Sequence, residues 1–156
     1  MYLIDGYNFI FHIDPDPIPI ERSRAALLNL IASVQPYYKK EFVVVFDGQD
    51  PHKDFFSKTL FVGIEVVFTP SSQSADNFII EFLETHHTPA DIQVISSDKK
   101  LRKHCHHLGA QTESTEKFIR RIHKKHKHQQ GPLQKTQEEK NVSYWCRIFS
   151  SEEDSE

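Results

Sequence analysis

Cysteines and long apolar runs are scarce in this chain of 156 residues. Its two cysteines, Cys105 and Cys146, are too few for a disulfide framework and lie in no paired zinc spacing. We therefore expect two ordinary thiols in a reducing cytoplasm. A run of about eighteen apolar residues, which a membrane helix needs, is absent, and no positively charged start precedes the first apolar run. These absences predict a soluble, unexported protein.

A strong net charge is also missing. The formal charge of −3 gives no overall signature of nucleic-acid binding, although ten histidines and a local basic segment make this average misleading. The length and the hydrophobic content of 38% suit one domain with a sizeable core. We predict a domain over residues 1–128, then a polar linker and tail over 129–156, where Gly131 and Pro132 mark the linker and Trp145 lies in a short apolar patch.

Short apolar runs alternate with segments of helical period. The runs are rich in β-branched and aromatic residues and predict buried strands at residues 1–4, 42–46, 64–68 and 92–95, with a short fifth strand at 110–112. Helices are expected at 20–34, from the N-cap Ser74, at 99–108, and from Ser114 or Thr115 onward. Residues 11–20 are read as a loop, and 49–60 as a loop or weak helix. This alternation predicts an α/β fold with a mostly parallel sheet.

Carboxylates follow the predicted strands. Asp5, Asp47 and Asp98 each come after a strand, and Asp76 lies in the first turn of the helix that follows Ser74. Each alone is explained by a turn or a helix cap. The carboxyl ends of parallel strands share one edge of the sheet, however, so the four side chains are expected to gather there. Because like charges repel unless a cation neutralises them, the pattern favours an oxygen-ligand site for magnesium or manganese.

The same residues carry a resemblance to a known family. Leu3-Ile-Asp-Gly-Tyr-Asn8, Val45-Phe-Asp47, Val67-Phe-Thr69 followed by Ser74-Ala-Asp76, and Val94-Ile-Ser-Ser-Asp98 resemble the motifs of a YacP-type NYN domain of the PIN-like nuclease group. The resemblance spans roughly residues 1 to 125. It implies a Rossmann-like three-layer sandwich and a metal-dependent endoribonuclease that leaves a 5′ phosphate. For the YacP type it also implies cleavage of messenger RNA in association with the ribosome.

The resemblance also assigns residues. The family's acidic site falls on Asp5, Asp76 and Asp98, with Asn8 as a polar companion and Asp47 as a further metal ligand. Where relatives often carry an acid shortly before the third aspartate, this chain has Gln73, which leaves fewer charges for Mg²⁺ or Mn²⁺. One ion and two ions both fit the sequence. Ser97 or Asn8 would position water or phosphate, or serve only in capping and turn formation.

The most basic segment is residues 117–128, which contains no acid. Helical spacing is expected to bury Phe118, Ile119 and Ile122 and to turn the basic side chains to water, where they suit RNA phosphates or form a solvated face. The predicted RNA-binding residues are Arg120, Arg121, Lys124 and Lys125. A zinc site at His104, His106 and His107 with Cys105 is discounted, because adjacent helical residues point in different directions and no second ligand pair follows.

Two other functions remain open. A catalytically weak RNA- or ribosome-binding module on the same fold is the alternative to a nuclease. A phosphatase is less favoured, because the aspartate phosphatase signature has a second acid two residues beyond the first, where this chain has Tyr7.

Overall fold

The computed structural model describes residues 1–17, 19–48 and 56–129. The predicted linker at Gly131 and Pro132, the apolar patch at Trp145, and Cys146 lie outside the described residues. Among the described helices, none combines the length and the apolar character that crossing a membrane requires.

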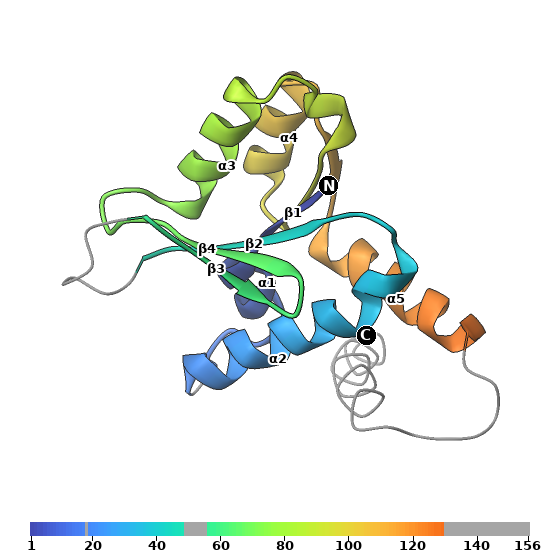
Figure 1. Ribbon diagram of the computed structural model, residues 1–156. Helices are drawn as coiled ribbons and strands as arrows, with labels where there is room; N and C mark the ends of the chain where they lie inside the picture. The colour runs from blue at the N-terminus through green and yellow to red at the C-terminus, as the bar shows by residue number, and fades with distance from the viewer. Residues whose placement is uncertain (18, 49–55, 130–156) are drawn as a thin grey trace, which may run out of the picture.

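A six-stranded sheet forms the centre of the molecule, in the order β3-β4-β2-β1-β5-β6 (Figure 1). Every pairing is parallel except that of β3 with β4. The strands are β1 (Tyr2–Asp5), β2 (Phe42–Phe46), β3 (Ser57–Phe61), β4 (Ile64–Phe68), β5 (Gln93–Ile95) and β6 (Gln111–Glu113). All side chains of β1 and β2 are buried, as expected for strands covered on both faces. The prediction of a mostly parallel α/β fold is confirmed.

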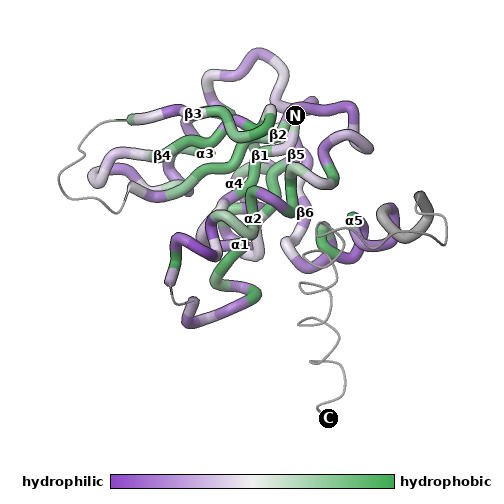
Figure 2. Tube along the Cα trace, turned by 60° about the horizontal axis from the view of Figure 1, so that its bottom comes forward, coloured by the Kyte–Doolittle hydropathy of each residue, from purple (hydrophilic) through white to green (hydrophobic). Residues whose placement is uncertain are grey.

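Helices cover both faces of this sheet, which makes a three-layer sandwich (Figure 1). One core packs α1, α2 and α5 on one face, and a second core packs α3 and α4 on the other. Figure 2 shows the hydrophobic strands enclosed between helices with long hydrophilic stretches. The helices are α1 (Gly6–Ile13), α2 (Ile20–Val34), α3 (Ala75–Thr85), α4 (Lys99–His107) and α5 (Thr115–Gln129), with short 3-10 turns η1 (Gln35–Tyr37) and η2 (Pro89–Asp91).

Helix α1 corrects one prediction, because residues 11–13 are helical and not part of a loop. The helix begins directly after β1, where the Asp5 side chain accepts a hydrogen bond from the Asn8 backbone N–H at 3.3 Å and so caps the first turn. Phe9, Ile10 and Ile13 bury the inner face of the helix. The prolines that suggested a loop begin only at position 15.

Strand β3 corrects a second prediction, because residues 57–60 are neither loop nor helix. The strand pairs with β4 through a two-residue turn, Val62-Gly63, in which both residues have positive φ. Such turns match the twist of a hairpin, but they are normally recognised by Asn-Gly or Asp-Gly. A β-branched residue rarely adopts positive φ, and Val62 at 48° therefore hid the hairpin in the sequence.

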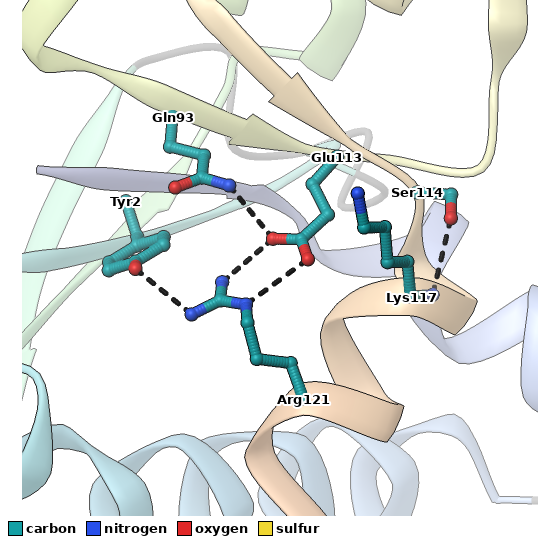
Figure 3. A network of polar contacts seen from close by, with 6 residues as sticks. All are labelled: Tyr2, Gln93, Glu113, Ser114, Lys117 and Arg121. Carbon is teal, nitrogen blue, oxygen red and sulfur yellow. Dashed lines mark hydrogen bonds and ion pairs between the residues drawn. The ribbon is translucent and has the colours of Figure 1, made fainter. Parts of the chain in front are cut away.

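A polar network joins helix α5 to three strands of the sheet, β1, β5 and β6 (Figure 3). The Arg121 guanidinium donates two hydrogen bonds to the Glu113 carboxylate, at 2.7 and 3.1 Å, and a third to the Tyr2 hydroxyl at 3.2 Å. Gln93 donates to the same carboxylate at 2.8 Å. Arg121 was predicted to face water, but its side chain is only 34% exposed and that of Glu113 only 4%. Arg121 is therefore engaged in holding α5 against β1 and β6.

This network predicts that Arg121→Gln lowers the free energy of unfolding by about 2–4 kcal/mol, because Glu113 would be left buried without its cation. Urea denaturation measures the loss. Arg120→Gln is the matched control: Arg120 pairs with Glu116 at 3.4 Å on an exposed surface, so its loss should cost under about 1 kcal/mol. Equal stability of the two variants would contradict a structural role for Arg121.

Candidate active site

Four aspartates approach one edge of the sheet. Strand β1 lies between β2 and β5, and the chain proceeds from β1 to β2 and β4 on one side and to β5 and β6 on the other. This reversal of strand order is the place where open α/β sheets bind ligands, beyond the carboxyl ends of the strands. Asp5 ends β1, Asp47 and Asp98 follow β2 and β5, and Asp76 enters in the first turn of α3.

Asp5 and Asp76 lie in direct contact. Asp5 is 5% exposed, and its carboxyl group makes a hydrogen bond with that of Asp76. Burial, followed by the Asp76 charge, this hydrogen bond and the Asp47 charge, raises the pKa of Asp5 to about 8. Burial also raises the pKa of Asp76, although the hydrogen bond acts to lower it. The two carboxyl groups therefore share a proton, and Asp5, the more deeply buried of the two, has its pKa raised to about 8.

Asp47 fixes where Asp76 lies. Its Oδ1 accepts a short hydrogen bond from the backbone N–H of Ala75, the first residue of α3. The turn after Asp47 is locked, since the Thr69 hydroxyl accepts from the Gly48 N–H at 3.2 Å and donates to the Gln73 carbonyl at 2.7 Å. A side chain at Gly48 would place its Cβ 1.8 Å from the Thr69 carbonyl oxygen, so only glycine fits there.

Asp98 caps α4 and lies beside the loop that follows β5. Its Oδ1 accepts from the backbone N–H groups of Lys100 and Leu101, at 2.9 and 3.2 Å. Its charge also raises the pKa of Asp76, after burial and with that of Asp47. The predicted capping role is therefore present, together with electrostatic proximity to the acid pair.

Asn8 and Ser97 bind each other. The Asn8 side-chain oxygen accepts from both the backbone N–H and the hydroxyl of Ser97, each at 2.8 Å. These bonds join the first turn of α1 to the loop before Asp98, across 89 positions of sequence. Asn8 is thus a positioning residue that holds the Asp98 loop against β1.

The donor chemistry of this cluster suits a hard cation. Carboxylate oxygens are the preferred ligands of Mg²⁺ and Mn²⁺, and a buried acid that must keep its proton beside a second acid shows a local demand for positive charge. Within the described residues, however, no group of three His, Cys, Asp or Glu side chains is arranged to hold one ion. The structure therefore brings together the pair Asp5 and Asp76, with Asp47 and Asp98 close enough to act through their charges.

The predicted RNA-binding residues of α5 are not gathered at this cluster. Arg121 is bound to Glu113, and the Lys125 ammonium lies 4.1 Å from the centre of the Tyr38 ring, near the start of β2 at the opposite edge of the sheet. Arg120 and Lys124 are exposed. In the described part of the chain, residues 104–107 form no metal site. Burial raises the pKa of the Cys105 thiol to about 11.

Thr69 and Gly48 were missed as organisers of the site. The sequence did contain a signal for them, because Asp47-Gly48 follows β2 and Thr69 follows β4. The parallel pairing of these two strands brings Gly48 and Thr69 together.

A model of the YacP-like NYN domain family matches residues 2–154, a range that includes most of the predicted linker and tail. The structure is similar to the crystal structure of Rae1 (YacP) from Bacillus subtilis, with a TM-score of 0.64 and 23% identity over 98% of this chain and 83% of that chain. A tryptophan-to-leucine mutant of the same protein gives a TM-score of 0.62 and 19% identity, over 96% and 98% of the two chains. At these identities the likeness shows the fold. No curated protein sequence matches the chain.

The acid pair predicts how stability depends on pH. The folded protein holds the Asp5 proton up to a pKa of about 8, whereas the ordinary value is 3.8. The stabilisation is therefore complete below the ordinary value and is lost as pH rises toward 8. In EDTA, the melting temperature of the wild type should fall by several degrees relative to Asp5→Asn between pH 5 and 9, given about 2–4 °C per kcal/mol at this size. Calorimetric curves that stay parallel would contradict the shared proton.

Proposed function

The chain belongs to the YacP-like NYN domain family, whose domains are of the nuclease type, and we propose that it is a metal-dependent endoribonuclease that cleaves RNA phosphodiester bonds. The observation that carries the proposal is Asp5: a buried acid at the point where strand order reverses, in contact with Asp76. Placing a buried carboxyl group against a second, half-buried one costs stability. A binding site for a divalent cation gives that arrangement a use.

Asp5 and Asp76 would hold Mg²⁺ or Mn²⁺, with Asp47 and Asp98 adding negative charge. A divalent ion at such a site supplies an activated water, neutralises phosphoryl oxygens and stabilises a departing ribose oxygen. The protein's own part is placement. Asp47 fixes the start of α3 through Ala75, and Asn8 fixes the loop before Asp98 through Ser97. These bonds hold the backbone segments that carry Asp76 and Asp98 in place near Asp5.

The substrate that we propose is messenger RNA, cut in association with the ribosome in the cytoplasm. This part of the proposal rests on the family resemblance and on the basic side chains of the protein. On α5, the exposed Arg120 and Lys124 remain candidates for contacts with RNA phosphates far from the acids, whereas Arg121 and Lys125 have partners within the fold.

A second candidate function is an RNA- or ribosome-binding module with weak catalysis or none. Two observations favour it. Asp47 and Asp98 each use one carboxylate oxygen to bind backbone N–H groups, which reduces what they offer to a metal. In addition, Gln73 occupies the place where relatives often carry an acid, and its amide donates to Glu81 at 2.8 Å.

We predict that Asp5→Asn and Asp98→Asn each abolish RNA cleavage in Mg²⁺ or Mn²⁺ while the fold is preserved. Asparagine keeps the size and the capping oxygen but removes the charge that attracts the ion, and Asn caps helices about as well as Asp. Cleavage is followed on labelled free RNA and on translating ribosomes. Asp16→Asn, at an exposed position on the loop after α1, is the control and should cleave like the wild type.

Near-normal cleavage by Asp98→Asn would show that Asp98 serves only as a helix cap. If the wild type cleaves neither substrate and takes up no divalent metal, the nuclease proposal is wrong and the RNA- or ribosome-binding module takes its place.

The exposed cations of α5 are expected to contribute to affinity for RNA or the ribosome. The double variant Arg120→Gln/Lys124→Gln should weaken RNA or ribosome binding without unfolding the protein, because both side chains are exposed. On single-stranded RNA, each lost phosphate contact lowers the slope of log affinity against log salt by about 0.7. Filter binding at several salt concentrations measures the slope; an unchanged slope and affinity would show that this face of α5 is only solvated.

A further inference from the structure

Helix α4 carries a row of cations that begins at the acid site. Its nine residues include Lys99, Lys100, Arg102, Lys103 and three histidines, and no acid. Asp98 is its N-cap, so Lys99 and Lys100 lie within one turn of the aspartate cluster. This basic segment directly follows one of the aspartates of the candidate active site, whereas Lys125 of α5 lies toward the opposite edge of the sheet.

The cations of α4 face outward. Leu101 and Cys105 are its buried residues and pack against the core shared with α3. Lys99 and Lys103, which are four positions apart, lie on the opposite face and are exposed, as are Lys100 and the histidines 104, 106 and 107. Side chains on a helix lean toward its N-terminus, and the lysines therefore point back toward the edge that holds the acids.

The stability of α4 does not account for these lysines. A cation in the first turn of a helix opposes the helix dipole, which favours acids there. Helices α2, α3 and α5 follow that rule, with Glu21, Asp76 and Glu116 in their first turns, but α4 has two lysines and no acid. In the described part of the chain, Lys99, Lys100 and Lys103 take part in no ion pair.

Arg102 differs from these lysines. Its guanidinium donates to the Ser96 carbonyl at 2.7 Å, so it holds the loop at the end of β5. Arg102 therefore does not belong to the row of exposed lysines on α4.

We propose that Lys99, Lys100 and Lys103 form a binding surface for the phosphates of single-stranded RNA beside the bond to be cut. The inference rests on the proposed function, and it gives the substrate a path. A cluster of carboxylates repels RNA, so a nuclease of this kind needs cations close by to bring the backbone to the acids. The α4 lysines lie close enough to provide them and are unpaired within the described fold. They are positioning residues, which act on where the RNA lies.

The test compares two double variants that remove the same charge. Lys99→Gln/Lys103→Gln removes two cations from α4. Arg22→Gln/Lys39→Gln removes two exposed cations, one in the first turn of α2 and one just after η1, on the other side of the sheet. The probe is a fluorescein-labelled single-stranded RNA of about 12 nucleotides, bound in EDTA so that no metal-dependent cleavage occurs. Anisotropy is measured at several salt concentrations.

The α4 variant should bind more weakly and lose about 1.4 from the slope of log affinity against log salt, for two phosphate contacts. The α2 variant should keep the wild-type slope. In Mn²⁺, the α4 variant should cleave with raised KM and near-normal kcat, since its lysines position RNA and do not touch the reacting atoms. Equal losses in both variants, or none in α4, would overturn the proposal.

Three further results would distinguish the α4 surface from its alternatives and from the nuclease proposal. Competition by poly-glutamate as effective as competition by RNA of equal charge would contradict an RNA surface and indicate an acidic protein partner. If the wild type never cleaves but the α4 variant loses RNA binding, the nuclease proposal fails and the α4 surface stands. If the wild type cleaves and the α4 variant binds RNA normally, the nuclease proposal stands and the α4 surface fails.

Discussion

The contact between the carboxyl groups of Asp5 and Asp76 is unfavourable unless the surrounding residues hold it in place. A carboxyl group 5% exposed at the end of a central strand has little water to stabilise its charge, and a second carboxyl group beside it raises the cost. In the metal-free protein this is resolved by a proton that Asp5 keeps. The surrounding fold maintains the contact: Asp47 binds the start of α3, the Gly48–Thr69 hydrogen bond joins the segments that follow β2 and β4, and Asn8 holds the loop before Asp98.

Opposite charges are handled in different ways in two parts of the fold. Where α5 packs on the sheet, Arg121 lies within 5.5 Å of the centres of the Tyr2 and Tyr38 rings and is neutralised by Glu113, so its charge is used inside the fold. At the carboxyl edge, negative charge accumulates at the acid pair and unpaired lysines line the neighbouring helix. This arrangement fits a protein whose carboxylates hold a cation, which in turn binds the phosphates of a polyanion.

Much of this fold could be predicted from local patterns. Strands such as residues 42–46 have a buried β-branched run, and helix starts at Ser74 and Asp98 have side chains that cap them. The aspartates could be placed because each follows an element whose end the sequence marks. The hairpin at Val62 could not, because its turn uses a residue that disfavours positive φ. Nor could the partners of Arg121 and Asn8, because those contacts are made by tertiary packing: Tyr2 is 119 positions from Arg121, and Ser97 is 89 from Asn8.

We propose that the pair of Asp5 and Asp76 holds a divalent cation. A crystal soaked in Mn²⁺ above pH 8, where Asp5 loses its proton, tests it most directly through anomalous scattering. We expect manganese density between the carboxylates of Asp5 and Asp76, at oxygen distances of about 2.0–2.6 Å. An acid pair that remains hydrogen-bonded, with no density between its carboxyl groups under these conditions, would contradict it.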